Sequence, residues 1–198
     1  MKFLLFAFLA LLGLWGFLPD ELNGYRSRSQ LAQELEIQQP ISDFEKAVEI
    51  IKKYETLHQP KHWPLVGYGH MVRPGEKFSR SKAMAPDKAE ELLRKDLLKN
   101  CAVFRSYGAD SLLLGVLAYN IGSGAVKKSS VVRKLNEGNR DIRDTYISYS
   151  KYRGKPHTQL RNRRIEEFEA LFIENPDNQT PTDTITITEI AKNIENHG

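Results

Sequence analysis

The segment that most constrains the fold is an apolar run in the second half of the chain, Ser111–Ile121, with the sequence SLLLGVLAYNI. It carries no charged residue, and apolar side chains fall on nearly every side when it is drawn as a helix. Such a helix has no face suited to water, so other elements must enclose it. The sequence therefore predicts a domain built around a buried central helix at this position.

Helical patterns also occur before and after this segment. Ser42 and Glu45 have the spacing of a capping box, and Phe44, Val48 and Ile51 follow at helical intervals, which predicts a helix from residue 42. Further helices are predicted at 86–101, from Ser129 or Ser130 to Gly138, at 141–152 and at 160–172.

One stretch, residues 56–73, interrupts the helical pattern. Its prolines and glycines forbid a long helix, while its Trp, Leu, Val, Tyr and Met residues favour short strands in a small hairpin. The predicted fold class is therefore α+β and predominantly helical, with a small antiparallel β element after the first domain helix.

Charge and hydropathy divide the chain into four parts. Residues 1–18 contain Lys2 and then sixteen uncharged, largely apolar residues, a pattern typical of a signal peptide or short membrane anchor. A polar linker is predicted at 19–40, the folded domain at 41–173 and a mobile acidic tail at 174–198. The domain carries 25 basic and 16 acidic residues, so the net charge of +4 hides a domain of +9 that should attract a polyanion.

Several classes of site are disfavoured. The single cysteine, Cys101, excludes an internal disulfide or a multi-cysteine metal centre. His58 and His62 have a metal-ligand spacing, but Pro60 lies between them and no carboxylate or cysteine completes the set, so we expect no metal and no cofactor. The basic clusters lack a recognition module and follow an export segment, so nucleic-acid binding is not expected.

Glu55 is the candidate for chemistry. It ends the first domain helix and has apolar or aromatic neighbours in the sequence, surroundings that favour a protonated carboxyl able to act as a general acid. The residues alone leave an alternative, a surface glutamate that pairs with Lys52 or Lys53.

Motifs downstream of Glu55 narrow this choice. They are, in order, Gly67-Tyr68-Gly69-His70, the stretch LAYNIGSGA at 117–125, SSVVRKLNEG at 129–138 and RNRRIEE at 161–167. Together with Glu55 these blocks resemble the phage-type lysozymes and endolysins, glycoside hydrolase family 24. The resemblance extends over nearly the whole domain and implies a lysozyme-like fold.

The resemblance also implies roles for particular residues. Glu55 falls on the proton donor to the glycosidic oxygen, and His70 falls on a histidine for which we expect a structural ion pair with Asp96. Tyr68 and Asn120 are expected to line the substrate cleft, although Asn120 could equally be a helix C-cap. The implied activity is cleavage of the β-1,4 bond between N-acetylmuramic acid and N-acetylglucosamine in peptidoglycan. The segment at 1–18 predicts that the protein is exported, with a possible membrane tether, and we expect a monomer.

The chain departs from the family pattern after Glu55. No acidic residue lies between Glu55 and Glu76, and Leu65 stands where the family has a threonine. A hydrolase that inverts configuration needs a second group to activate water, and His62, in preference to His58, could serve as that base. Two alternatives remain: a lytic transglycosylase that uses Glu55 alone, and a non-catalytic wall-binding accessory protein of the same fold.

Overall fold

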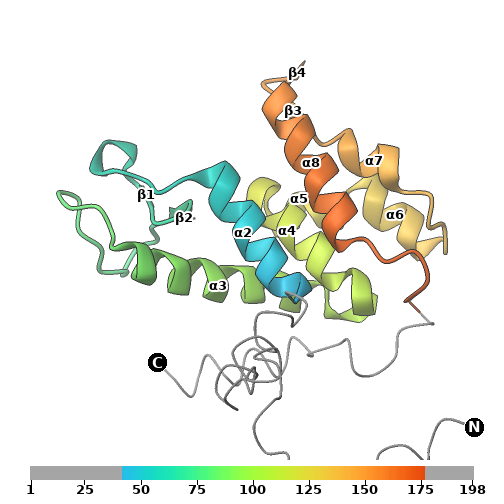
Figure 1. Cartoon of the computed structure of the whole chain (residues 1–198), viewed down its shortest axis with the longest axis horizontal. Coiled ribbons are helices and arrows are strands. Elements are labelled where there is room, and N and C mark those ends of the chain that lie inside the picture. Colours follow the sequence, from blue (N-terminus) through green and yellow to red (C-terminus); the bar gives the residue numbers. More distant parts are fainter. Residues whose placement is uncertain (1–41, 177–198) are drawn as a thin grey trace, which may run out of the picture. The chain divides into compact units, whose positions relative to one another are not determined.

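The computed structural model describes residues 42–176, and Figure 1 shows their arrangement. The predicted signal peptide or anchor, the linker and nearly all of the predicted tail lie outside the described residues. Among residues 42–176, no helix is long and apolar enough to cross a membrane.

The described chain forms helices and two short hairpins. The helices are α2 (Asp43–Glu55), α3 (Pro86–Val103), α4 (Ser111–Ile121), α5 (Ser123–Lys127), α6 (Ser130–Asn136), α7 (Arg143–Ile147) and α8 (Thr158–Leu171), with 3-10 turns η2 (Pro60–His62) and η3 (Arg105–Asp110). Strands β1 (Leu65–Val66) and β2 (His70–Met71) pair antiparallel, as do β3 (Lys151–Tyr152) and β4 (Lys155–Pro156). The fold class is the α+β, predominantly helical one that the sequence predicted.

Helix α4 is the centre of the domain, as its apolar sequence predicted. It contacts α2, α3, α5 and α8, and its residues from Leu113 to Ala118 are all buried. Figure 1 shows α4 between α3 and α8, with α2 crossing in front in this view.

Helices α3 and α4 approach each other closely in this core. A Cβ atom added to Gly115 of α4 would lie only 2.5 Å from Cys101 Sγ and 3.0 Å from the Cys101 backbone nitrogen. The absence of a side chain at Gly115 therefore lets the two helix backbones pack together, and it leaves the Cys101 thiol fully buried.

The start of α2 matches the sequence prediction only in part. Ser42 caps the helix, since its Oγ accepts a hydrogen bond from the backbone N–H of Glu45. The Glu45 side chain does not complete the capping box: both of its oxygens accept hydrogen bonds of 2.6 Å from the Arg94 guanidinium on α3. A forked pair of opposite charges is the stronger interaction, and it joins α2 to α3.

The helix predicted at 141–152 is wrong in its second half. Helix α7 ends at Ile147, and Lys151 already belongs to the β3–β4 hairpin. The hairpin turns at Arg153 and Gly154, which have φ values of +49° and +78°. Positive φ at both central residues is the geometry of a tight two-residue turn, and it cannot continue a right-handed helix.

Candidate active site

Glu55 lies where three parts of the domain meet. It is the last residue of α2, and the backbone leaves the helical conformation at Thr56, whose φ is +53°. Glu55 Oε1 accepts a hydrogen bond of 2.6 Å from Arg163 Nη1 on α8, and Oε2 faces the β1–β2 loop at Gly69. The side chain is 21% exposed, so the carboxyl group is held firmly and still reaches solvent.

The sequence neighbours of Glu55 suggested either apolar surroundings or an ion pair with Lys52 or Lys53, and the structure differs from both. Lys52 bonds to Glu49 and Glu90, and Lys53 bonds to Glu166, so neither lysine pairs with Glu55. The environment is not simply apolar either, because α8 supplies a guanidinium. Residues next to Glu55 in the sequence could not reveal a partner that is 108 positions away.

The loop between β1 and β2 brings glycine against the Glu55 carboxylate. A Cβ on Gly69 would stand 3.3 Å from Glu55 Oε2, and Gly69 has a φ of +98°. Both the conformation and the space at this position favour glycine, which lacks a side chain. The GYGH motif therefore acts at this point through its backbone.

Arg163 belongs to a buried network of charges on α8. Its Nε donates to Glu167 Oε1 at 2.8 Å, and Arg164 Nη1 donates to Glu167 Oε2 at 2.6 Å. Arg164 Nη2 also donates to Asn120 Oδ1 at 2.6 Å. Burial opposes the charge on Arg163, but the carboxylates of Glu167 and Glu55 outweigh it and hold the pKa of Arg163 above its usual range.

The sequence reasoning gave no role to these α8 residues. The RNRRIEE block contributed only to the family resemblance, and no contact was predicted for its arginines. A usable signal was present, because Arg163 and Arg164 lie four and three residues before Glu167, the spacings at which helix side chains pair.

The two residues expected to line the cleft, Asn120 and Tyr68, are held by different elements: Asn120 is bonded to α8 and Tyr68 to α4. Asn120 is exposed near the end of α4, and the helix C-cap is Gly122, so the C-cap role does not fall to Asn120. Tyr68 is half-buried, and its carbonyl oxygen accepts a hydrogen bond of 2.8 Å from the Tyr119 hydroxyl. This bond ties the β1–β2 loop to the central helix.

His70 and Asp96 lie in direct contact. His70 Nδ1 is 2.5 Å from Asp96 Oδ2, and His70 Nε2 is 2.9 Å from Glu76 Oε2. The imidazole thus joins β2 to α3 and to the loop that follows β2. The backbone N–H of Arg73 and the His70 ring hold the pKa of Glu76 below its usual range. Glu76 was not anticipated from the sequence.

The two histidines considered as a base lie together, but the structure records no hydrogen bond from either to Glu55. The rings of His58 and His62 meet edge to face with centroids 5.1 Å apart. His62 Nδ1 accepts a hydrogen bond of 3.1 Å from the Gln59 backbone N–H. A neutral ring that accepts at Nδ1 carries its proton on Nε2, so neither nitrogen of His62 can accept another proton while that bond persists. This geometry counts against His62 as the base.

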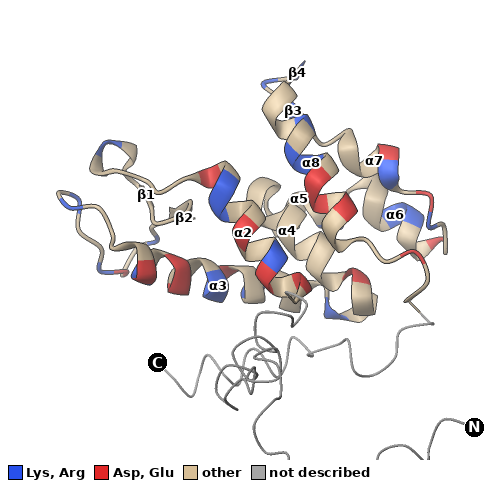
Figure 2. Ribbon diagram, in the orientation of Figure 1, with Lys and Arg blue, Asp and Glu red and all other residues tan. Residues whose placement is uncertain are grey.

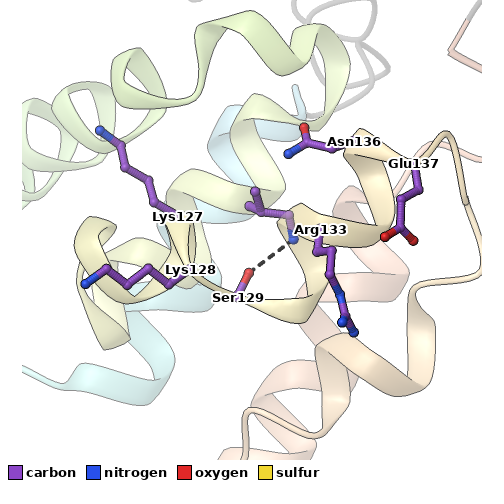
Figure 3. A pocket seen from close by; sticks show the side chains of 7 residues that line it. Lys127, Lys128, Ser129, Arg133, Asn136 and Glu137 are labelled. Atoms are coloured by element: carbon purple, nitrogen blue, oxygen red, sulfur yellow. Dashed lines mark hydrogen bonds between the residues drawn. The ribbon is translucent and has the colours of Figure 1, made fainter.

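A surface pocket of about 270 Å³ lies elsewhere, on α5 and α6. Figure 3 shows that the Lys127 and Lys128 side chains extend away from Arg133. The pocket includes none of the candidate site residues. Within residues 42–176, no group of three or more His, Cys, Asp or Glu side chains is placed to hold a metal ion.

The fold is of the lysozyme-like α+β class. The chain shares its fold with the muramidase domain of SpmX from Asticaccaulis excentricus, with a TM-score of 0.53, 26% identity and coverage of 64% of this chain and 95% of that one. It also shares the fold of a mutant form of P22 lysozyme, with a TM-score of 0.53, 22% identity and coverage of 67% of this chain and 99% of that one.

The chain belongs to the phage lysozyme family, whose model matches residues 46–167. It is 28% identical to an endolysin of Bacillus phage B103 over 172 residues, which are 73% of this chain and 62% of that protein. It is 32% identical to an endolysin of Bacillus phage PZA over 133 residues, covering 62% and 48%. The chain therefore spans between about half and three-fifths of the length of these relatives.

Proposed function

We propose that the protein is a lysozyme that cleaves the β-1,4 bond between N-acetylmuramic acid and N-acetylglucosamine in bacterial peptidoglycan. Membership of the phage lysozyme family supports this activity. The observation that carries the proposal is the Glu55 carboxyl group, which is partly exposed at the end of α2 and fixed by Arg163. Glu55 is the proton donor to the leaving sugar oxygen, a step that requires a carboxyl group held at one point beside the bond.

The distribution of charge supports an anionic, wall-like substrate. Figure 2 shows acidic residues on α2, α3 and α8, where many of them form ion pairs. The β3–β4 hairpin carries Lys151, Arg153 and Lys155, and none of these has a carboxylate within 4 Å among the described residues. Exposed, unneutralised cations attract the carboxylates of wall peptides and anionic wall polymers.

Two matched variants of α2 test the role of Glu55. Glu55→Gln keeps the shape of the side chain but removes the transferable proton, so clearing of a peptidoglycan suspension should fall to background. Glu49→Gln makes the same change on the same helix, at a side chain that is 64% exposed and that bonds only to Lys52 among the described residues, and it should clear normally. A parent protein that does not clear peptidoglycan would instead support the non-catalytic accessory alternative.

A specific observation favours a second candidate, lytic transglycosylation. His62 Nδ1 is already engaged by Gln59, and the sequence offers no acid between Glu55 and Glu76. In this reaction Glu55 acts alone, since a hydroxyl group of the substrate itself attacks in place of water. Mass spectrometry of the released muropeptides separates the two: 1,6-anhydro ends indicate transglycosylation, and reducing ends indicate hydrolysis. A His62→Ala variant with unchanged reducing-end release would remove His62 from the mechanism.

The proposed place of action is outside the cytoplasm. The segment at 1–18, in which Lys2 precedes an apolar run, supports export, with or without retention as a membrane tether. Fractionation of cells that express the full chain would distinguish a released protein from one held at the membrane.

A further inference from the structure

Glu167 is a buried carboxylate that does not contact Glu55 yet is joined to it. Its side chain is 0% exposed, as is that of Arg164, and Arg163 is only 2% exposed. Each of its oxygens binds a different guanidinium, Oε1 that of Arg163 and Oε2 that of Arg164. A charge without access to water must be paired and hydrogen-bonded, so the three side chains constrain one another tightly.

The two arginines extend from Glu167 to two different candidate site residues. Arg163 Nη1 binds Glu55 Oε1, and Arg164 Nη2 binds Asn120 Oδ1, each at 2.6 Å. Within residues 42–176, every hydrogen bond recorded for these two guanidiniums goes to Glu167 or to one of the two candidate residues. Arg163 Nη2 and Arg164 Nε are buried and have no hydrogen-bond partner in the described part of the chain. No other acceptor in this part of the chain therefore sets the orientation of either arginine.

The remaining neighbours cannot replace Glu167. The Tyr54 ring lies 5.8 Å from the Arg163 guanidinium, but its hydroxyl is committed to Glu166 at 2.8 Å. The Tyr146 hydroxyl donates to Glu167 Oε2 at 2.9 Å, which supports the carboxylate and does not contact Arg163. Without the negative charge of Glu167, two buried guanidiniums would repel each other, and Arg163 would lose the contact that fixes its Nε.

We propose that Glu167 is a positioning residue for the reaction: through Arg163 and Arg164 it sets the positions of the Glu55 carboxyl group and the Asn120 amide relative to each other. This inference rests on the proposed function, because the reaction is what makes these positions matter. Glu167 itself touches no substrate. Its effect is on the geometry at which the proton is transferred, and a displacement of about 1 Å at such a point costs about 100-fold in rate.

The test compares Glu167→Gln with Asp110→Asn. Asp110 is also buried, and it makes a forked pair with Arg140. It precedes α4, whereas Asn120 is near the other end of that helix, about 15 Å along its axis. Both variants should unfold at lower temperature. Only Glu167→Gln should lower kcat on soluble peptidoglycan strands, by about 10- to 100-fold, with KM nearly unchanged.

A third variant, Tyr146→Phe, and NMR spectroscopy separate a positioning role of Glu167 from a purely structural one. Tyr146→Phe retains the Glu167 carboxylate and should keep kcat near that of the parent. The NMR signals of the Arg163 Nε–H group and the Glu55 carboxyl carbon should move in Glu167→Gln and stay in place in Asp110→Asn. Equal kcat losses in Glu167→Gln and Asp110→Asn, or unmoved Arg163 and Glu55 signals in Glu167→Gln, would overturn the proposal. A parent inactive on peptidoglycan refutes the proposed function alone, and the NMR signals then decide whether Glu167 positions Glu55.

Discussion

Replacing Gly69 by alanine tests how closely the β1–β2 loop confines the Glu55 carboxylate. The new Cβ would lie 3.3 Å from Glu55 Oε2, so the carboxylate has to move by a few tenths of an ångström. It cannot retreat freely, since its other oxygen is bonded to Arg163 at 2.6 Å. If about 1 Å of displacement costs about 100-fold, a few tenths should cost about three- to tenfold in kcat.

Gly75→Ala is the matched control for this change. Gly75 has a φ of +92°, close to the +98° of Gly69, but a Cβ there meets nothing within 4 Å. Both variants therefore incur the conformational cost of a side chain at positive φ, about 1 to 3 kcal/mol. For a domain of this size that cost corresponds to a fall in Tm of about 5 to 15 °C.

The assay is the rate of clearing of a peptidoglycan suspension per folded molecule, measured well below both melting temperatures. We expect similar losses of Tm in the two variants and a loss of activity only in Gly69→Ala. Equal activities in the two variants would show that the contact between Gly69 and Glu55 does not constrain the reaction, and the reasoning would be refuted.

Two further predictions concern the core. Gly115→Ala should destabilise the domain by about 1 to 3 kcal/mol, because its Cβ would overlap Cys101. Gly124→Ala, which has open space in α5, should be neutral or stabilising, and urea titration of both variants measures the difference in the free energy of unfolding. Burial raises the pKa of the Cys101 thiol to about 12, so a disulfide reagent at pH 8 should label Cys101 only after urea unfolds the protein. Rapid labelling of the folded protein would contradict this burial.

Elements whose pattern is local were predictable from the sequence. The central helix at 111–121 was predicted because no arrangement other than burial suits it, and α3 and α8 follow from their helical spacing. The β1–β2 hairpin was predicted from residues that exclude a helix. These inferences need only the preferences of neighbouring residues.

Features that depend on an unusual backbone conformation or on distant partners were not predictable in this way. The helix predicted at 141–152 stops early because Arg153 and Gly154 adopt a turn, and arginine is not a residue type that indicates positive φ. Glu45 has the right spacing for a capping box, yet an arginine 49 positions away competes successfully for it. The surroundings of Glu55 depend in the same way on which face of α8 docks against α2.

The separation of Glu55 and Arg163 along the chain has a consequence for synthesis. The two residues are 108 positions apart, one on the first described helix and the other on the last. A chain still emerging from the ribosome has Glu55 long before α8 exists, and contacts between such distant segments form only after long loops close. The contact between Glu55 and Arg163, on which the proposed reaction depends, therefore forms only once the last described helix has been made and has docked.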